Sequence, residues 1–213
     1  MVWGRKRLGA YTHKSPDSVF RDLASMINRY AENHMTLFEY IAIAFSMILS
    51  ITALRALSVV PYAVQAGKRY WIYLIWLFTT LMGIVILFWA YWWYRDLEWN
   101  IVSFLIVLAS PAVLYINVSI LVPENAADVT SWREYFYSVR VRFFLTGLAW
   151  VIVTFAAGIF IPIQSLEAFF GIALVLMNVI GAVSSKPRVQ AVLVLIPPVM
   201  FPISTWLLYF QPT

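Results

Sequence analysis

Two ionisable residues lie inside the first long apolar stretch of the chain, and they could carry ion or proton chemistry. Glu39 and Arg55 are 16 residues apart within residues 36–60. On a helix this separation is a rise of about 24 Å, whereas the hydrocarbon core of a bilayer is about 30 Å thick. A proton or ion path, or pairing with another helix, would explain both charges. The alternative is that both snorkel to opposite interfaces, which is harder for the shorter Glu39.

A second group of candidate residues combines prolines with side-chain amides in later apolar stretches. Proline removes a backbone hydrogen bond and kinks a helix. The predicted helix breaks are Pro111, Pro197, Pro198 and Pro202. Such breaks in two three-helix halves would fit an inverted repeat, as in some transporters. Ordinary proline kinking in a membrane helix is the favoured explanation, because the halves show no other similarity. The amides near them could line a polar cavity or bond across helices. The candidate intramembrane polar site is therefore Glu39, Arg55, Asn117 and Asn178.

Aromatic residues are concentrated between residues 88 and 99. Such a cluster could stack on a cation, a quinone or a carotenoid. A belt of rings in the headgroup region explains the same residues without a ligand. We therefore predict an interfacial aromatic cluster of Trp89, Trp92, Trp93 and Trp99. No cofactor is predicted, and contact with lipid, quinone or carotenoid stays open.

The residue types that are missing argue against several kinds of chemistry. The chain has no cysteine, both histidines precede residue 35, and no lysine stands in mid-span. The apolar stretches therefore offer no histidine ligand for haem or a metal and no lysine for a Schiff base. Nucleotide-binding and metallopeptidase motifs are absent from the sequence. We expect a protein that is not an enzyme, with no catalytic, cofactor-binding or metal site.

The elements that must position these residues follow from composition. The chain has 213 residues, of which 62% are hydrophobic and 12% charged. Soluble domains are about half apolar and about a quarter charged. A water-soluble core could not hide this much apolar surface in a chain of this size. The composition therefore predicts an integral membrane protein, and we expect it in a bacterial inner (plasma) membrane.

Six apolar stretches are long enough to cross a bilayer. They are continuously apolar, which favours helices over the alternating strands of a barrel. The predicted spans are 36–60, 70–94, 101–121, 141–161, 168–184 and 189–210. The fourth helix should begin near Trp132, outside the membrane, because Ser131 and Glu134 form a capping box. The predicted fold is an all-α bundle of six transmembrane helices.

The N-terminal segment has a different pattern. Residues 1–14 are polar and basic, and Ser15, Pro16 and Asp17 are typical of a helix start. Apolar residues then recur at helical spacing up to Tyr30, which predicts an amphipathic helix on the headgroups or on the bundle. We divide the chain into residues 1–34, a basic tail with an interfacial amphipathic helix, and 35–213, the transmembrane domain.

Basic residues do not settle the orientation. The loops between spans 1 and 2, 3 and 4, and 5 and 6 hold seven Lys and Arg residues, and the opposite side also holds seven. Charges near the ends of spans have the greatest effect on the orientation in the membrane. This favours an orientation in which the loops between spans 1 and 2, 3 and 4, and 5 and 6 lie in the cytoplasm. The predicted fourth helix carries a basic collar of Arg133, Arg140 and Arg142.

Two functions compete on these observations. The first is an accessory or scaffold subunit that docks on a larger membrane assembly, with the bilayer and other membrane subunits, or a second copy, as partners. The alternative is a small oligomeric transporter or channel with a polar path near Glu39 and the proline-broken spans. A transporter needs a polar cavity within the membrane, whereas a scaffold should have a dry core. Nucleic acid is not an expected partner, because the basic residues form short collars.

Overall fold

A computed structural model of the chain describes residues 21, 36–157 and 165–209. The chain divides into two compact units, Met1–Leu37 and Phe38–Thr213. The amphipathic helix predicted within residues 1–34 lies outside the described part of the chain, apart from Arg21. In the second unit the described residues form helices and connections without any strand.

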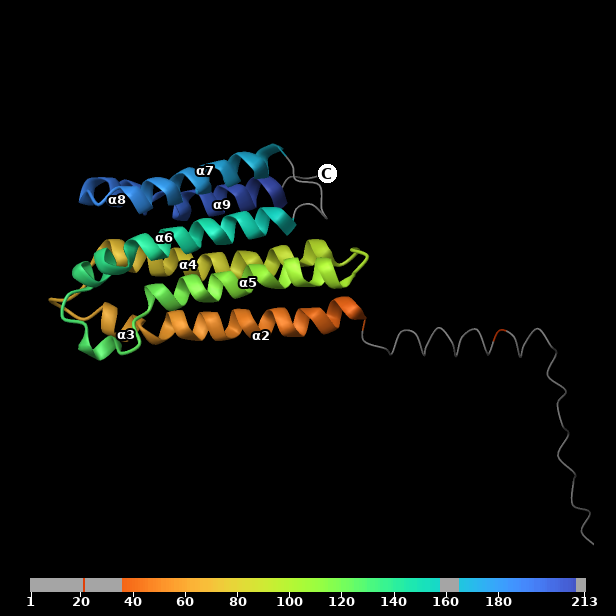
Figure 1. Ribbon diagram of the computed structural model, residues 1–213, viewed down its shortest axis with the longest axis horizontal. Helices are drawn as coiled ribbons and strands as arrows, with labels where there is room; N and C mark the ends of the chain where they lie inside the picture. The colour runs from red at the N-terminus through yellow and green to blue at the C-terminus, as the bar shows by residue number, and fades with distance from the viewer. Residues whose placement is uncertain (1–20, 22–35, 158–164, 210–213) are drawn as a thin grey trace, which may run out of the picture. The chain divides into compact units, whose positions relative to one another are not determined.

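The helices run side by side along one axis, with α4, α5 and α6 between α2 on one edge and α7, α8 and α9 on the other (Figure 1). The first elements are α2 (Leu37–Ser58), α3 (Val60–Ala63), α4 (Trp71–Ala90), the 3-10 helix η1 (Tyr91–Tyr94) and α5 (Ile101–Leu121). The remaining elements are η2 (Ala126–Asp128), α6 (Trp132–Ala157), α7 (Ser165–Val183), α8 (Pro187–Leu193) and α9 (Ile196–Tyr209). We call the end that carries the α3–α4, α5–α6 and α7–α8 connections the odd-loop end.

Four helical segments are long and apolar enough to cross a membrane. They are Leu37–Ala63, Trp71–Tyr94, Ile101–Asp128 and Trp132–Ala157. Within the described residues the apolar parts of the last two predicted spans are shorter, Ala168–Val183 and Pro187–Ile203. The all-helical fold is confirmed, and four segments support a multi-pass membrane protein. The number of six spans stays a prediction.

Local sequence explains where two of these helices begin. Asn100 accepts hydrogen bonds from the backbone N–H of Val102 at 2.9 Å and of Ser103 at 3.0 Å. The Ser103 hydroxyl accepts in return from the Asn100 N–H at 2.9 Å, which completes a capping box before α5. The Ser131 hydroxyl accepts from the Glu134 N–H at 3.4 Å. The start of α6 predicted at Trp132 is confirmed.

The prolines differ in what they do to their helices. Pro111 lies inside α5, which continues through it, and α9 likewise continues through Pro202. A single proline removes one backbone bond, and neighbouring helices can hold such a helix together. The break in the last predicted span lies between Leu193 and Ile196, directly before Pro197 and Pro198. Two consecutive prolines remove two donors, so the helix is interrupted before them.

The core has an aromatic cluster at each end. Toward the odd-loop end, the ring of Tyr73 stacks on that of Trp132 with centroids 4.7 Å apart. Toward the other end, the ring centroid of Tyr91 lies 4.5 Å from that of Phe45 and 4.8 Å from that of Phe38. The Tyr91 hydroxyl also donates to the Phe38 carbonyl. The contacts of Tyr91 with Phe38 and Phe45 attach α2 to the bundle. Large apolar side chains cover the outside, as expected where a helix faces lipid.

Candidate functional site

A cavity of about 60 Å³ lies between α4, α5, α6, α7 and α9. On α4 its lining runs from Trp76 to Gly83, about 8 to 18 Å along the helix from Trp71. The cavity is therefore in the odd-loop half of the bundle, within the apolar length of α4. Aromatic and aliphatic side chains form most of its wall. Its polar lining residues are Trp76, Thr79, Thr80, Asn117, Trp150 and Asn178.

Asn117 joins α5 to α6 at this cavity. Its side chain is buried, and its Nδ2 donates to the Phe143 carbonyl at 2.7 Å and to the Thr146 hydroxyl at 2.9 Å. Asn178 of α7 is also buried, and its Nδ2 donates to the Leu174 carbonyl one turn earlier at 2.8 Å. Both amides line the same cavity. The structure thus brings together two of the four residues of the predicted polar site.

Gly147 of α6 leaves room for both amides beside its backbone. A Cβ at this position would lie 2.4 Å from Asn178 Oδ1 and 3.6 Å from Asn117 Nδ2. Any larger residue would therefore displace the Asn178 amide or the helix that carries it. The glycine is the reason why α7 can place its amide directly against the backbone of α6.

Three polar atoms at the cavity have no protein partner. Trp76 Nε1, Thr79 Oγ1 and Trp150 Nε1 are buried and make no hydrogen bond. Trp76 is 3% exposed and Thr79 is 7% exposed. A buried polar group without a partner costs about 1 to 3 kcal/mol by mutational data. By liquid volume, the space would hold about two water molecules. The described lining residues include no ionisable side chain.

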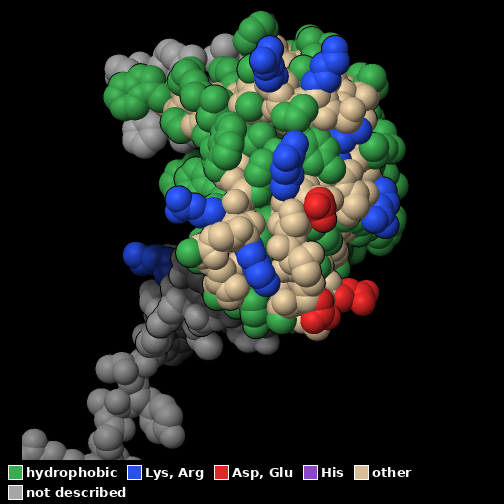
Figure 2. Space-filling view, turned by 90° about the vertical axis from the view of Figure 1, so that its left-hand side faces the viewer, with side chains coloured by type: hydrophobic (Ala, Val, Ile, Leu, Met, Phe, Trp, Pro, Cys, Tyr) green, Lys and Arg blue, Asp and Glu red, His purple; other side chains and the backbone are tan. Residues whose placement is uncertain are grey.

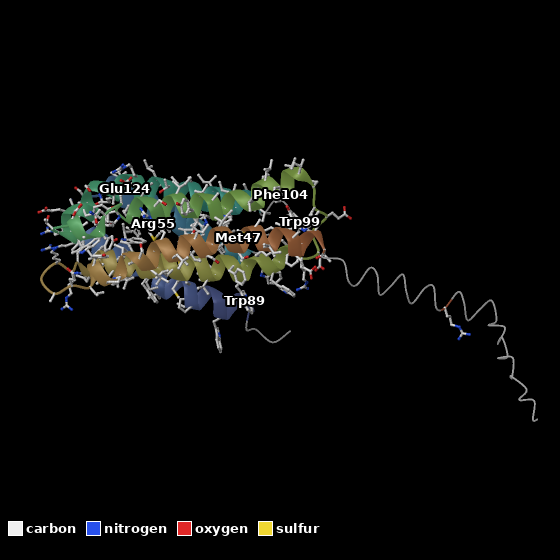
Figure 3. All side chains as sticks on the ribbon, turned by 90° about the horizontal axis from the view of Figure 1, so that it is seen from below. Met47, Arg55, Trp89, Trp99, Phe104 and Glu124 are labelled. Atoms are coloured by element: carbon white, nitrogen blue, oxygen red, sulfur yellow. The ribbon has the colours of Figure 1, made fainter. Side chains whose placement is uncertain are left out.

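Glu39 and Arg55 lie elsewhere. Glu39 is exposed in the first turn of α2. Arg55 is half-buried in the last turn, where its Nη2 donates to the carbonyls of Val122 at 3.4 Å and Pro123 at 3.5 Å. Figure 3 shows Arg55 on the side of Glu124, toward the odd-loop end. Neither charge lines the cavity, so the four predicted residues do not form one site.

A second buried polar group closes the turn between α7 and α8. The guanidinium of Arg140 is buried, and its Nη1 donates to the carbonyls of Gly181 at 2.6 Å, Ala182 at 3.0 Å and Ser184. Gln190 Nε2 donates to the Gly181 and Ser184 carbonyls at 3.1 and 2.7 Å. We call Arg140 and Gln190 with these carbonyls the arginine clamp. Arg140 Nε and Gln190 Oε1 are buried without a partner.

The clamp corrects the interpretation of Arg140 as part of a basic collar. Arg140 is only 7% exposed, whereas Arg133 and Arg142 on the same helix are exposed. The last carbonyls of a helix have no partner within the helix, and they form the negative end of its dipole. The guanidinium of Arg140 donates to these carbonyls and places a positive charge at the negative end of the α7 dipole. The charge of Arg140 is therefore directed into the bundle.

The two ends of the bundle differ in their surface residues. Figure 2 shows the odd-loop end, where Lys and Arg outnumber the acidic side chains. The exposed basic residues of these connections and adjoining helices are Lys68, Arg69, Arg133, Arg142, Lys186 and Arg188. At the opposite end the side chains of Trp89, Trp92 and Trp93 are exposed. Trp99 instead packs against Tyr91, with ring centroids 6.4 Å apart. Three of the four predicted interfacial tryptophans thus face outward.

Sequence reasoning missed the indole groups at the cavity. Trp150 falls in the middle of the predicted span 141–161, far from either interface, and this position was the available signal. Trp76 lies near the start of its span and resembles a belt residue by position alone. The chain matches no protein-family model, no curated protein and no solved structure in the comparisons made.

Proposed function

We propose that the protein is a small membrane transporter or channel whose path passes through the cavity between α4, α5, α6, α7 and α9. One observation carries this proposal. Three buried polar atoms, Trp76 Nε1, Thr79 Oγ1 and Trp150 Nε1, lack a partner, and all three residues line this cavity. These atoms are buried in the wall, so their side chains would have to turn toward the cavity before water or a polar solute there could supply the missing hydrogen bonds.

A purely structural role for these polar residues would lower the stability of the fold. A bundle stabilised only by packing would be more stable with apolar residues at these positions, since unpaired groups are costly in an apolar environment. The amides of Asn117 and Asn178 add further polar atoms to the same wall. Residues of this wall carry three of the seven buried unpaired atoms among the described residues, and such a grouping suits a path for a polar solute.

The broken last helix supports the same function. Pro197 and Phe201 of α9 line the cavity, directly after the interruption between α8 and α9. Pro197 and Pro198 lack an N–H, so the carbonyls four residues earlier cannot complete helical bonds to them. Interrupted helices beside a polar site are a recurring arrangement in transporters. A change of angle at this interruption would alter the width of the cavity.

The proposal can be tested with single cysteines, because the natural chain contains none. Gly83 lines the cavity, and a Cβ built there has no neighbour within 4 Å, so Gly83→Cys fits without strain. Val85 on the same helix is 60% exposed on the outside and provides the matched control Val85→Cys. Methyl methanethiosulfonate modifies the thiolate form, which needs water in order to ionise.

We expect Gly83→Cys in native-lipid vesicles to be modified at least about tenfold faster than Val85→Cys, because only the cavity would hold water. Equal and slow modification of both cysteines would mean a dry cavity and would overturn the transport function. The accessory or scaffold role stays a separate prediction. Purification in mild detergent tests it, since stoichiometric partner proteins are expected for a subunit and a lone chain or homo-oligomer for a transporter.

A further inference from the structure

Two arginines from different helices lie near the end of α5, at the odd-loop end of the bundle. Arg55 of α2 donates from Nη2 to two carbonyls at this end of α5. On α6 the Tyr135 hydroxyl donates to the Ile120 carbonyl at 3.1 Å, in the last turn of the same helix. Arg55 and Arg142 are both close enough to the Tyr135 hydroxyl to interact with it electrostatically. The two guanidinium groups therefore belong to one part of the surface.

Neither guanidinium is neutralised by an acidic side chain. Among the described residues neither forms an ion pair, and the pair of Arg95 and Asp96, 3.0 Å apart, lies at the opposite end of the bundle. Arg142 is exposed and donates no hydrogen bond to a described residue from its side chain. Arg55 is half-buried and uses only Nη2, so its other donors stay available. A guanidinium presents its donors in a planar fork that suits the oxygens of a phosphate.

The position of both arginines along their helices corresponds to the level of a lipid headgroup. Arg55 is in the last turn of α2, and Arg142 is the second residue of the apolar stretch 141–161. The helix α6 begins about 15 Å earlier, at Trp132. The headgroups lie directly outside the hydrocarbon core, so long basic side chains at the ends of apolar segments can reach their phosphates.

Exposed apolar side chains continue the same surface one turn deeper in the bundle. On α2 this residue is Ile51, four positions before Arg55, and on α6 it is Leu145, three positions after Arg142. Residues three or four apart lie on one face of a helix. Because α2 runs toward the odd-loop end and α6 runs away from it, both apolar residues lie on the membrane side of their arginine (Figure 1). The surface thus combines charge for a headgroup with apolar side chains for an acyl chain.

The rest of the odd-loop end has the same sign of charge. Exposed Lys and Arg side chains outnumber the acidic ones there (Figure 2). Among the described residues of this end, six basic side chains are exposed, against the acids Glu124, Asp128 and Glu134. The described charges of the opposite end are Arg95 and the acids Glu39, Asp96 and Glu98. A net positive end in contact with headgroups attracts anionic lipids.

We infer that Arg55 and Arg142 bind the phosphate of an anionic phospholipid, such as phosphatidylglycerol, whose acyl chain lies along Ile51 and Leu145. We call these four residues the lipid site. Zwitterionic lipids also contain a phosphate, but their ammonium group balances its charge and is repelled by the two guanidinium groups. The lipid site is separate from the cavity, so it does not depend on the proposed transport function.

The test is native mass spectrometry of the full-length protein in non-ionic detergent, with equal amounts of phosphatidylglycerol and phosphatidylcholine of the same acyl chains. At an ionic strength of about 0.15 M, charges more than about 8 Å from the headgroup are largely screened. We expect bound phosphatidylglycerol to exceed bound phosphatidylcholine at least about tenfold, because each basic residue at a headgroup contributes about fivefold. Equal retention of the two lipids would overturn the inference.

Two double variants locate the site. Arg55→Gln with Arg142→Gln removes both guanidinium groups and should reduce the preference to about twofold or less. The matched control is Arg69→Gln with Arg188→Gln, which removes the same charge from exposed positions at the same end. This control should keep the preference to within about twofold of the natural protein. An equal loss in both variants would mean a general attraction to the basic end and would overturn the lipid site.

A single variant keeps the test valid if the double variant fails to fold, which thermal unfolding in detergent shows. Arg142→Gln changes an exposed side chain and should lower the preference about fivefold. An unchanged preference would overturn the inference.

Inorganic phosphate separates a lipid site from a site for free anions. In about tenfold molar excess it should leave the phosphatidylglycerol bound, because it has no acyl chain to bury. Displacement of the lipid by inorganic phosphate would overturn the assignment to a phospholipid.

Discussion

The arginine clamp and the cavity both bury polar groups between α6 and α7, but they differ in what those groups contact. In the clamp, Arg140 Nη1 and Gln190 Nε2 donate to backbone carbonyls at the end of α7. In the cavity, Trp76 Nε1, Thr79 Oγ1 and Trp150 Nε1 have no protein partner. The clamp also holds two unpaired atoms, Arg140 Nε and Gln190 Oε1, but each of its two side chains donates to carbonyls, whereas no protein atom bonds the three groups at the cavity.

The position of each group along its helices explains the difference. Helix ends leave carbonyls without partners, so a donor that reaches the end of α7 finds several acceptors at once. The cavity lies along the middle of helices whose backbone groups are already bonded to each other. A side chain there must share a carbonyl that already accepts a helical bond, as Asn117 does at Phe143 and Asn178 does at Leu174. Buried donors in this bundle therefore find several acceptors at a helix end and fewer between helix faces.

The largest expected effect comes from removing the charged member of the clamp. Arg140→Met should lower the free energy of unfolding by about 3 kcal/mol or more, because the carbonyls of Gly181, Ala182 and Ser184 lose a charged donor inside the bundle. Denaturant titration in detergent, followed by tryptophan fluorescence, measures this change. Arg142→Met on the exposed face of the same helix should change it by less than about 0.5 kcal/mol. Equal effects of the two substitutions would contradict a structural role for the clamp.

The second prediction concerns the neutral member of the clamp. Gln190→Leu removes two hydrogen bonds to carbonyls that Arg140 also contacts, so those carbonyls keep one donor. We expect a loss of about 1 to 2 kcal/mol, measured by the same titration. In the double variant with Arg140→Met, the loss should differ from the sum of the two single losses, because both residues share acceptors. Strict additivity would show that they act independently.

The smallest effect on stability, and one of opposite sign, is expected at the cavity. Thr79→Val replaces an unpaired hydroxyl by a methyl group of similar size. The free energy of unfolding should stay the same or rise by up to about 1 kcal/mol, while solute passage falls. The unfolding titration checks the effect on stability, and the rate at which polar solutes enter vesicles containing the protein checks the effect on passage. A destabilised Thr79→Val protein would mean that the hydroxyl is structural, and the contrast with the clamp would fail.

Helix positions could be predicted from sequence where local signals are strong. The start of α6 follows from the capping signal at Ser131, and the bounds of α5 coincide with the predicted span 101–121. Apolar runs and helix caps depend only on residues that are neighbours in the chain, so a single sequence is enough to identify them. The break in the last helix was expected at its prolines, and the structure puts it directly before Pro197.

The composition of the candidate site could be predicted only in part. Asn117 and Asn178 were identified as amides within apolar stretches, but their proximity depends on how α5, α6 and α7 are rotated about their axes. The same rotation turns Arg140 into the bundle while Arg142 faces outward. Apolar spans of this kind have no strong polar face from which rotation can be read, since both core and lipid-facing residues are hydrophobic.

The clamp also sets an order of events during synthesis. Arg140 emerges from the ribosome 44 residues before Ser184, whose carbonyl it finally contacts. At about 5 to 20 residues per second, the guanidinium must wait about 2 to 9 s for its acceptors. Its place near the odd-loop end of α6 allows it to remain in the headgroup region during this delay. The bonds from Arg140 to the end of α7 therefore form only after α7 has been synthesised, so these contacts between α6 and α7 are made late.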